Sequence, residues 1–229
     1  MKPQTVEAVL YRPADVPEPP GAANFTAQAL AEVQGWYTDR LGASFSIVPP
    51  VSFAAGQAWE EIAAAARGPG YAPGTACGFN IWRAAVADIA SRGFNICDDS
   101  RTRFLFYFRP PLPAGDETPV GLGGTVGVEN FGCRYARPGM FCMSDQMTRL
   151  LCGETTEALR AAGWDVPWFA STERAPRGAI AHELVHCWTE LPHSETGHTI
   201  TNSWWVWPEV GFLREEERIL VTSGALVRA

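Results

Sequence analysis

The sequence predicts an α/β domain built on one mixed, twisted sheet, with helices beside it and a small C-terminal lobe. The chain has 229 residues, and 46% of them are apolar, which is enough for one sizeable core. Segments rich in β-forming residues alternate with segments whose apolar residues recur at helical spacing. We therefore expect one domain over residues 1–229, with an upper lobe at about 1–190 and a lower lobe at about 191–229.

The first part of the chain has the order strand, helix, strand. Residues 5–11 carry β-forming side chains and predict a strand. Residues 25–41 keep apolar side chains at helical spacing, and Gly42 should end that helix. Residues 44–48 predict a second strand, which we expect the Pro49–Pro50 pair to close.

The middle of the chain supplies two helices and two strands. Residues 59–67 are rich in alanine, and residues 79–92 place their large apolar side chains on one helix face. Residues 102–109 form the most apolar strand, which we expect at the centre of the sheet with both faces covered. Residues 125–131 predict a further strand after a glycine-rich stretch.

The last part is mainly helical. Residues 145–162 predict one helix, and residues 163–176 a loop. A helix containing residues 181–188 should follow, because its apolar residues recur at helical spacing and prolines lie just before and after it. Residues 194–202 are polar and loop-like, and residues 214–221 predict a closing helix with acidic residues in its first turn.

Residues 182–186, His-Glu-Leu-Val-His, match the zinc-peptidase pattern H-E-x-x-H. On a helix, His182 and His186 lie on one face and can offer two imidazole nitrogens to one ion. Glu183 can then take a proton from a water that zinc has made acidic. All four histidines of the chain fall within residues 182–198, which is not expected of scattered surface histidines.

A catalytic zinc ion (Zn²⁺) needs a third protein ligand and an open position, and His193 is the first choice. The run from His182 to Ser194 resembles the H-E-x-x-H-x-x-G-x-x-H motif of the metzincin peptidases, within the zincin superfamily. The resemblance implies that His182, His186 and His193 bind zinc and that Glu183 is the general base. It also implies that the strand at 125–131 is a sheet edge that pairs with extended substrate. An ordinary edge or inner strand with a glycine bulge is an equal alternative from the sequence.

The sequence departs from this motif in two places. Six residues separate His186 from His193 where the family has five, and Thr189 and Glu190 replace the family glycine. No methionine follows Met147, so the family's methionine turn is absent, and Ile200 takes that place by position. Other candidates for the third ligand therefore remain open, namely His198, Glu209, Glu215, Glu216 and Glu217.

The predicted function is a zinc metalloendopeptidase that hydrolyses protein or peptide substrates in a cleft between the lobes. Trp204, Trp205 and Trp207 follow the histidines; they could wall a specificity pocket, but packing of the lower lobe is the favoured interpretation. Two alternatives remain. One is a binding module with a decayed zincin fold, and the other is a cytoplasmic or injected toxin protease with a narrow protein substrate.

Six cysteines fit three disulfides and an oxidising compartment, so we expect a secreted protein whose signal segment is not in this chain. A cytoplasmic protein with reduced thiols is the second choice, because the chain starts with Met-Lys-Pro-Gln and no apolar segment. From sequence neighbourhood alone, we expect the following pairs: Cys77–Cys97, Cys133–Cys142 and Cys152–Cys187.

Charge and hydropathy exclude two classes of partner. The net charge is −7 and the pI is near 5.1, whereas a nucleic-acid-binding domain normally presents a basic face. No apolar run approaches the roughly 20 residues that a membrane-spanning helix needs. The oligomeric state stays open.

Overall fold

A computed structural model of the chain describes every residue except 67–76, 112–122, 127–130, 135–138, 144, 165, 167, 169–171, 173, 196 and 229. Its main sheet has the strand order β3-β1-β4-β6-β5. The strands are β1 (Thr5–Arg12), β3 (Ser46–Ala54), β4 (Arg101–Tyr107), β5 (Gly123–Val126) and β6 (Met140–Met143). All neighbouring pairs are parallel except β5 and β6, which are antiparallel, so the predicted mixed sheet is confirmed.

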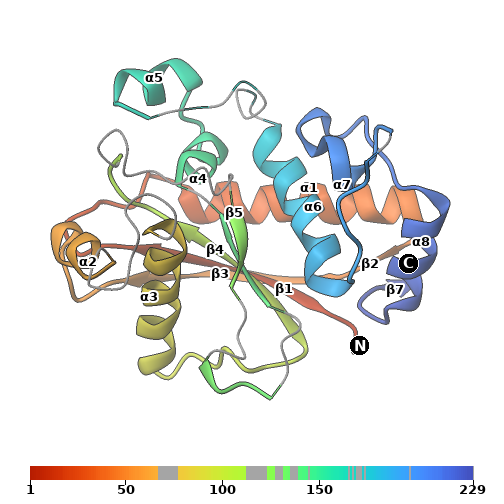
Figure 1. Cartoon of the computed structure of the whole chain (residues 1–229), viewed down its shortest axis with the longest axis horizontal. Helices are drawn as coiled ribbons and strands as arrows, with labels where there is room; N and C mark the ends of the chain where they lie inside the picture. The colour runs from red at the N-terminus through yellow and green to blue at the C-terminus, as the bar shows by residue number, and fades with distance from the viewer. Residues whose placement is uncertain are drawn as a thin grey trace.

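The helices lie along and around this sheet (Figure 1). They are α1 (Ala22–Leu41), α2 (Trp59–Ala66), α3 (Cys77–Ser91), α4 (Asp145–Leu151), α5 (Thr156–Ala161), α6 (Ala175–Trp188), α7 (Ile200–Ser203) and α8 (Arg214–Thr222), with a 3-10 turn, η3 (Trp204–Val206). A small ribbon pairs β2 (Ala43–Ser44) with β7 (Val227–Arg228) near the chain end.

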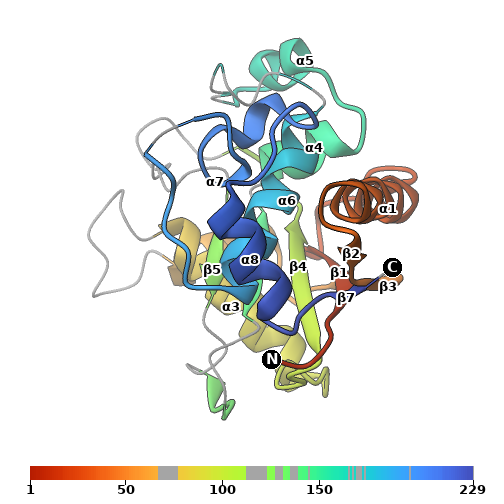
Figure 2. The same cartoon turned by 90° about the vertical axis from the view of Figure 1, so that its right-hand side faces the viewer.

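The two faces of the sheet carry different helices. Successive strand residues point to opposite faces, so Thr102 and Arg103 mark the two sides of β4. Thr102 accepts a hydrogen bond from the indole of Trp188 on α6, at 2.7 Å. The guanidinium of Arg103 lies over the ring of Phe94, just after α3. Figure 2 shows α1 and α3 on either side of the sheet, and the hydroxyl of Tyr37 on α1 donates to the Ala181 carbonyl on α6.

The apolar strand at 102–109 lies at the centre of the sheet, as predicted. β4 has β1 on one side and β6 on the other, and Phe104, Leu105 and Phe106 are fully buried. Every described residue of β4 after Arg101 is buried, which a strand achieves only when both faces are covered. Thr102 of this strand holds Trp188, the last residue of α6, against the sheet.

The structure differs from the sequence predictions in the following elements. The strand expected at 44–48 continues through Pro49 and Pro50, because β3 is an edge strand and its register against β1 shifts at the prolines. The helix expected at 145–162 is two helices, α4 and α5, since Gly153 adopts a left-handed conformation with φ +90°. The strand β6 was not expected, and α7 lies in the polar segment 194–202.

β5 is the edge strand opposite β3, and it begins two residues before the strand expected at 125–131. Residues 127–130 of that prediction lie outside the described residues. Because β5 pairs only with β6 in the described sheet, its outer side is where a further strand would add.

The predicted disulfides are wrong. Cys97 pairs with Cys133, with a Cα–Cα distance of 5.1 Å, so neither Cys77–Cys97 nor Cys133–Cys142 forms. Cys152 and Cys187 are not joined either. The physical reason is topological: the loop before β4 lies beside the segment after β5, which sequence neighbourhood does not reveal. The sequence predicted three disulfides, whereas the described cysteines form one, and its pairing was not predicted.

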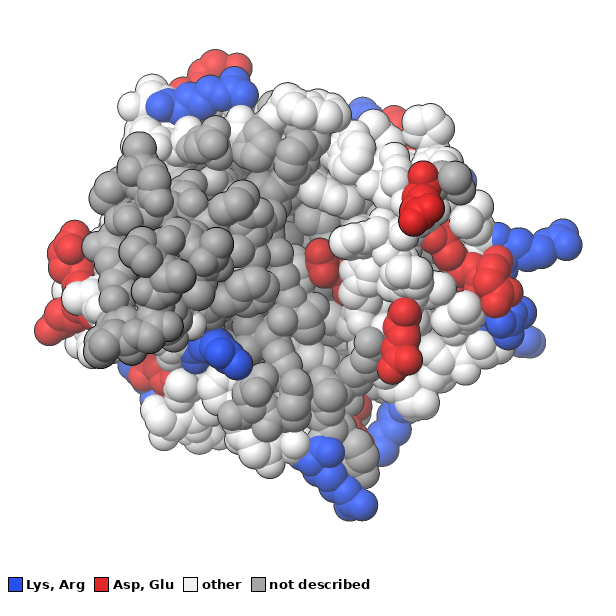
Figure 3. Space-filling view, viewed as in Figure 1, with Lys and Arg blue, Asp and Glu red and all other residues white. Residues whose placement is uncertain are grey.

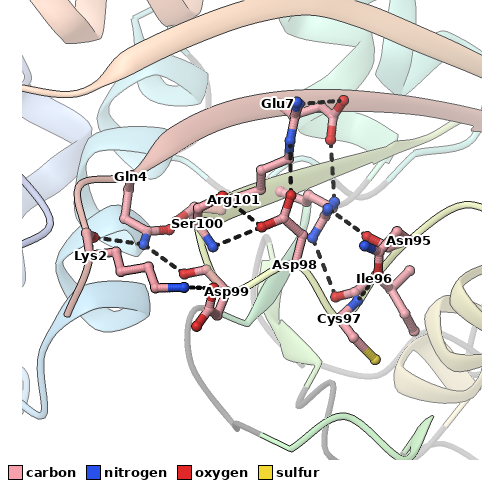
Figure 4. Close-up of polar contacts among 12 residues, drawn as sticks. Lys2, Gln4, Glu7, Asn95, Ile96, Cys97, Asp98, Asp99, Ser100 and Arg101 are labelled. Carbon is pink, nitrogen blue, oxygen red and sulfur yellow. Dashed lines mark hydrogen bonds and ion pairs between the residues drawn. The ribbon is translucent and has the colours of Figure 1, made fainter.

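A network of ion pairs and hydrogen bonds lies at the end of the sheet near Cys97, one of the two disulfide cysteines (Figure 4). Glu7 on β1 contacts Arg103 at 3.2 Å and Arg101 at 3.3 Å. Arg103 also donates to the carbonyls of Asn95 and Ile96. The network therefore holds the loop that carries Cys97 against β1 and β4.

The surface carries charges of both signs. In the described part of the face in Figure 3, acidic and basic side chains lie mostly near the outline of the molecule. Among the described residues, no helix is both long and apolar enough to cross a membrane.

Candidate metal centre

Helix α6 holds the first two histidines. It begins at Ala175, with Pro176 in its first turn, and ends at Trp188. His182 and His186 are one turn apart, and their ring centroids lie 4.6 Å from each other. Hydrogen bonds from Tyr37 to Ala181 and from Trp188 to Thr102 flank both histidines and fix the helix against α1 and β4. The scaffold of the site is thus buried and rigid.

Three imidazole nitrogens converge at one point. The Nε2 atom of His182 lies 3.1 Å from that of His186 and 3.2 Å from that of His193. These ligand atoms all lie within 4.8 Å of one another. Three nitrogens bound to one tetrahedral zinc ion at about 2.0–2.1 Å would be roughly 3.3–3.4 Å apart. The two separations from His182 are close to this spacing, so the three histidines suit a metal ion.

The protein backbone selects the tautomer of two of these rings. His182 Nδ1 lies 2.7 Å from the carbonyl oxygen of Ile200, and His186 Nδ1 lies 3.0 Å from that of Leu191. A carbonyl oxygen can only accept, so each Nδ1 carries the proton. Each Nε2 then presents its lone pair toward the common point. Such partners orient metal-binding histidines and raise their basicity.

Thr189 turns the chain from α6 toward His193. It is the residue after the helix, in an extended conformation, and its backbone N–H donates to Val185. Its hydroxyl donates to the same carbonyl at 2.7 Å and accepts from the N–H of Leu191 at 3.2 Å. Threonine therefore ends the helix without a left-handed glycine, and the additional residue still delivers His193 to the site.

Glu183 lies beside the histidines. Its Oε1 atom is 3.7 Å from His182 Nε2, and its side chain is 18% exposed. Burial raises the pKa of Glu183 to about 8. Burial, helped by the neighbouring His186, lowers the pKa of His182 to about 3, which keeps this ring neutral as a metal ligand. A cation held between the histidines would favour the ionised form of Glu183.

The alternative third ligands lie elsewhere. His198 is exposed and is not in the histidine group, and Glu209 pairs with Arg174 at 2.8 Å. Glu215 pairs with Arg218 on α8. The remaining two glutamates are also outside the group: Glu216 accepts from Thr201 and from the N–H of Leu213, and Glu217 is half-buried. Among the described residues, His193 is the one that joins His182 and His186.

The segment that begins at Ile200, where the resemblance would place the methionine turn, contacts the site. Ile200 is fully buried, and its carbonyl holds His182. The Trp204 ring centroid lies 6.3 Å from that of His182, while Trp207 is buried in the core. Gly178 on α6 makes this contact possible, because a Cβ atom there would lie 1.9 Å from the Trp204 carbonyl oxygen.

Sequence reasoning missed the residues that support the site. Thr189, the Leu191 and Ile200 carbonyls and Gly178 carry no motif of their own. The sequence offered one signal for these residues, because Thr189 follows the helix where the metzincin motif has a glycine. The backbone carbonyls could not be found, because their role depends on tertiary position alone.

Comparisons with known proteins give a likeness in fold. No family model and no curated protein matches the sequence. Among solved structures, wild-type OgpA from Akkermansia muciniphila has a TM-score of 0.54 and 14% identity, over 98% of this chain and 62% of OgpA. Catalytically inactive OgpA with an O-glycopeptide substrate, glycodrosocin, has a TM-score of 0.55 and 12% identity, over 98% and 61%. Archaemetzincin from Methanopyrus kandleri has a TM-score of 0.42 and 13% identity, over 94% of both chains.

The chain spans about three fifths of the length of OgpA. The likeness to OgpA, together with the mixed sheet and its helices, confirms the predicted fold class, a zincin-like α/β fold.

Proposed function

We propose that this protein is a metzincin-like zinc endopeptidase, with His182, His186 and His193 as the zinc ligands. The observation that carries the proposal is the convergence of three Nε2 atoms, two of them with backbone partners on Nδ1. The donor set suits zinc, which accepts three histidines and keeps one position open in catalytic sites. Glu183 is the general base.

Each residue of the proposed site has a separate role in hydrolysis. A bound zinc ion would polarise the scissile carbonyl and make a water acidic. Glu183 takes a proton from the attacking water and passes it to the leaving amine. Ile200 and Leu191 hold the histidines in place during these steps. The largely buried setting of Glu183 strengthens its interactions with charge in the site.

The proposed substrate is a protein or peptide in an extended conformation. The outer side of β5 would take it as a further antiparallel or parallel strand, through backbone hydrogen bonds. The contact of α6 with β5 supports this, because a strand added there runs beside the metal helix. OgpA was solved with an O-glycopeptide, so an O-glycopeptide belongs in the substrate panel beside plain peptides.

We also propose that the protein acts in an oxidising compartment outside the cytoplasm. The Cys97–Cys133 disulfide supports this, since such bonds persist mainly in oxidising environments. The division into an upper lobe at about 1–190 and a lower lobe at about 191–229 remains part of the proposal, with the substrate cleft between them.

The first test is zinc content per chain for the wild type and for His193→Ala. We expect one zinc in the wild type and a sharp loss in the variant. Zinc retained in both would move the third ligand to another residue. No zinc in either protein, even after zinc is supplied, would contradict the proposal.

The second test is turnover of the peptide panel by Glu183→Gln. General-base catalysis contributes roughly 10²- to 10⁴-fold, so we expect a loss of that size with zinc retained. Glu190→Gln is the matched control, because Glu190 is an exposed glutamate outside the histidine group. A wild type that binds zinc and cleaves nothing in the panel would favour the decayed binding module instead.

A further inference from the structure

A cavity lies between α2 and α3, away from the histidines. Its volume is about 460 Å³, within the range of small-molecule sites. Asn80 and Arg83 of α3 and Phe131 line it, together with alanines of both helices. The small alanine side chains leave the space open, and α3 packs on the face of the sheet opposite α6.

Asn80 lines this cavity and carries an unused hydrogen-bond donor. Its side chain is 6% exposed, and its Nδ2 atom has no hydrogen-bond partner. A buried donor without a partner opposes folding, because it loses its bonds to water. Such groups are rare in native proteins, and each needs an explanation, such as a bound water, an ion or another ligand. Leucine has the same branched arrangement of side-chain heavy atoms without this penalty, so asparagine needs another reason.

Arg83 brings a positive charge to the same cavity. It lies three residues after Asn80, so both side chains leave α3 on one side. It forms no ion pair or hydrogen bond within the described part of the chain, and no acidic residue lines the cavity there. Arg92, which directly follows α3, differs in that it pairs with Asp88 at 2.8 Å. An unpaired cation in a chain of net charge −7 indicates a place for an anion.

We propose that this cavity binds an organic carboxylate, with Arg83 and Asn80 on its two oxygens and an apolar body against Phe131 and the alanines. One guanidinium balances one carboxylate charge, and charge-assisted hydrogen bonds to Arg are strong. A phosphate carries more charge and more acceptors than these two side chains satisfy. Phe131 and the alanines of the lining would pack against the carbon skeleton of the ligand. The proposal does not rest on the zinc site.

The test is calorimetric titration of the zinc-loaded protein with hexanoate, hexanamide and inorganic phosphate. We expect hexanoate to bind at least tenfold more tightly than either of the other two. Arg83→Gln should weaken hexanoate at least tenfold, whereas Arg218→Gln, which removes one exposed helix arginine elsewhere, should not change it. His193→Ala should keep hexanoate binding, which separates this cavity from carboxylate binding at zinc.

Asn80→Leu adds a second readout. We expect it to lose hexanoate affinity while the ligand-free protein melts at the same or a higher temperature, because an unsatisfied donor is removed. Unchanged hexanoate affinity in Arg83→Gln would overturn the proposal. Phosphate that binds as tightly as hexanoate would also overturn it, in favour of an inorganic anion site.

Discussion

Two buried polar clusters in this protein have opposite chemistry. Around Glu7, the charges satisfy one another: Arg103 and Arg101 contact its carboxylate, and Arg101 also contacts Asp98 at 3.3 Å (Figure 4). Around His182, three Nε2 atoms face each other. With Nδ1 protonated on His182 and His186, their Nε2 atoms are acceptors, so neither can donate to the other.

The difference teaches how to separate a structural cluster from a functional one. Donors and acceptors balance around Glu7, so that cluster needs nothing from outside the chain. The lone pairs of His182 and His186 face each other with no donor between these two rings, so a cation would complete this cluster. Burial is similar in both places, since Glu7 is 7% exposed and His182 is 4% exposed. The balance of charges and hydrogen bonds, and not depth, distinguishes the two clusters.

The largest expected effect is on the balanced cluster. Glu7→Leu leaves the buried guanidinium of Arg103 without its carboxylate, and breaking a buried pair in this way costs about 3–5 kcal/mol. The loss should appear equally with and without zinc in urea unfolding. Asp99→Asn is the control, because the exposed Lys2–Asp99 pair should contribute about 0–1 kcal/mol. A loss in Glu7→Leu no larger than in the control would break the comparison.

The second prediction tests the histidine cluster through the pH dependence of stability. In the metal-free protein, the pKa of His182 is lowered to about 3, mainly by burial, from an ordinary value of 6.5. Between these values the unfolded chain binds the proton and the folded chain does not. Stability should therefore fall as the pH drops below 6.5, by about 1.4 kcal/mol per unit, until the pH approaches 3.

His182→Asn isolates this contribution from other titrating groups. Urea unfolding of both metal-free proteins from pH 7 to pH 4.5 should show a smaller loss of stability in the variant. Equal pH dependence in the two proteins would mean that His182 is not held neutral in the folded state.

The smallest effect concerns the turn that delivers His193. Thr189→Val removes a hydroxyl that bonds both Val185 and Leu191, which should cost about 1 kcal/mol. Because the Leu191 carbonyl orients His186, zinc affinity should fall by up to about tenfold. Thr222→Val, which removes a similar exposed hydroxyl bond on α8, should leave zinc affinity unchanged. Competition with a zinc chelator measures both variants, and equal affinities would show that the turn does not support the site.

The sequence determined the elements with strong local patterns. The strand β1, the helices α1, α2, α3 and α8 and the central position of β4 follow from apolar periodicity and stop signals, which act within a few residues. The predictions failed where contacts between residues far apart in the sequence determine the structure. β3 runs through two prolines only because it is an edge, and Cys97 meets Cys133 only because two loops lie side by side.

The same division holds within the candidate site. The spacing of His182 and His186 is local, so one helix turn is enough to predict that they share a face. The arrival of His193, the backbone carbonyls behind the rings and the contact of Gly178 with Trp204 depend on how α6 packs against later segments. The sequence by itself thus determined which side chains carry the chemistry. Only the tertiary structure decided their geometry and tautomers, because hydrogen bonds between distant segments form after the chain is packed.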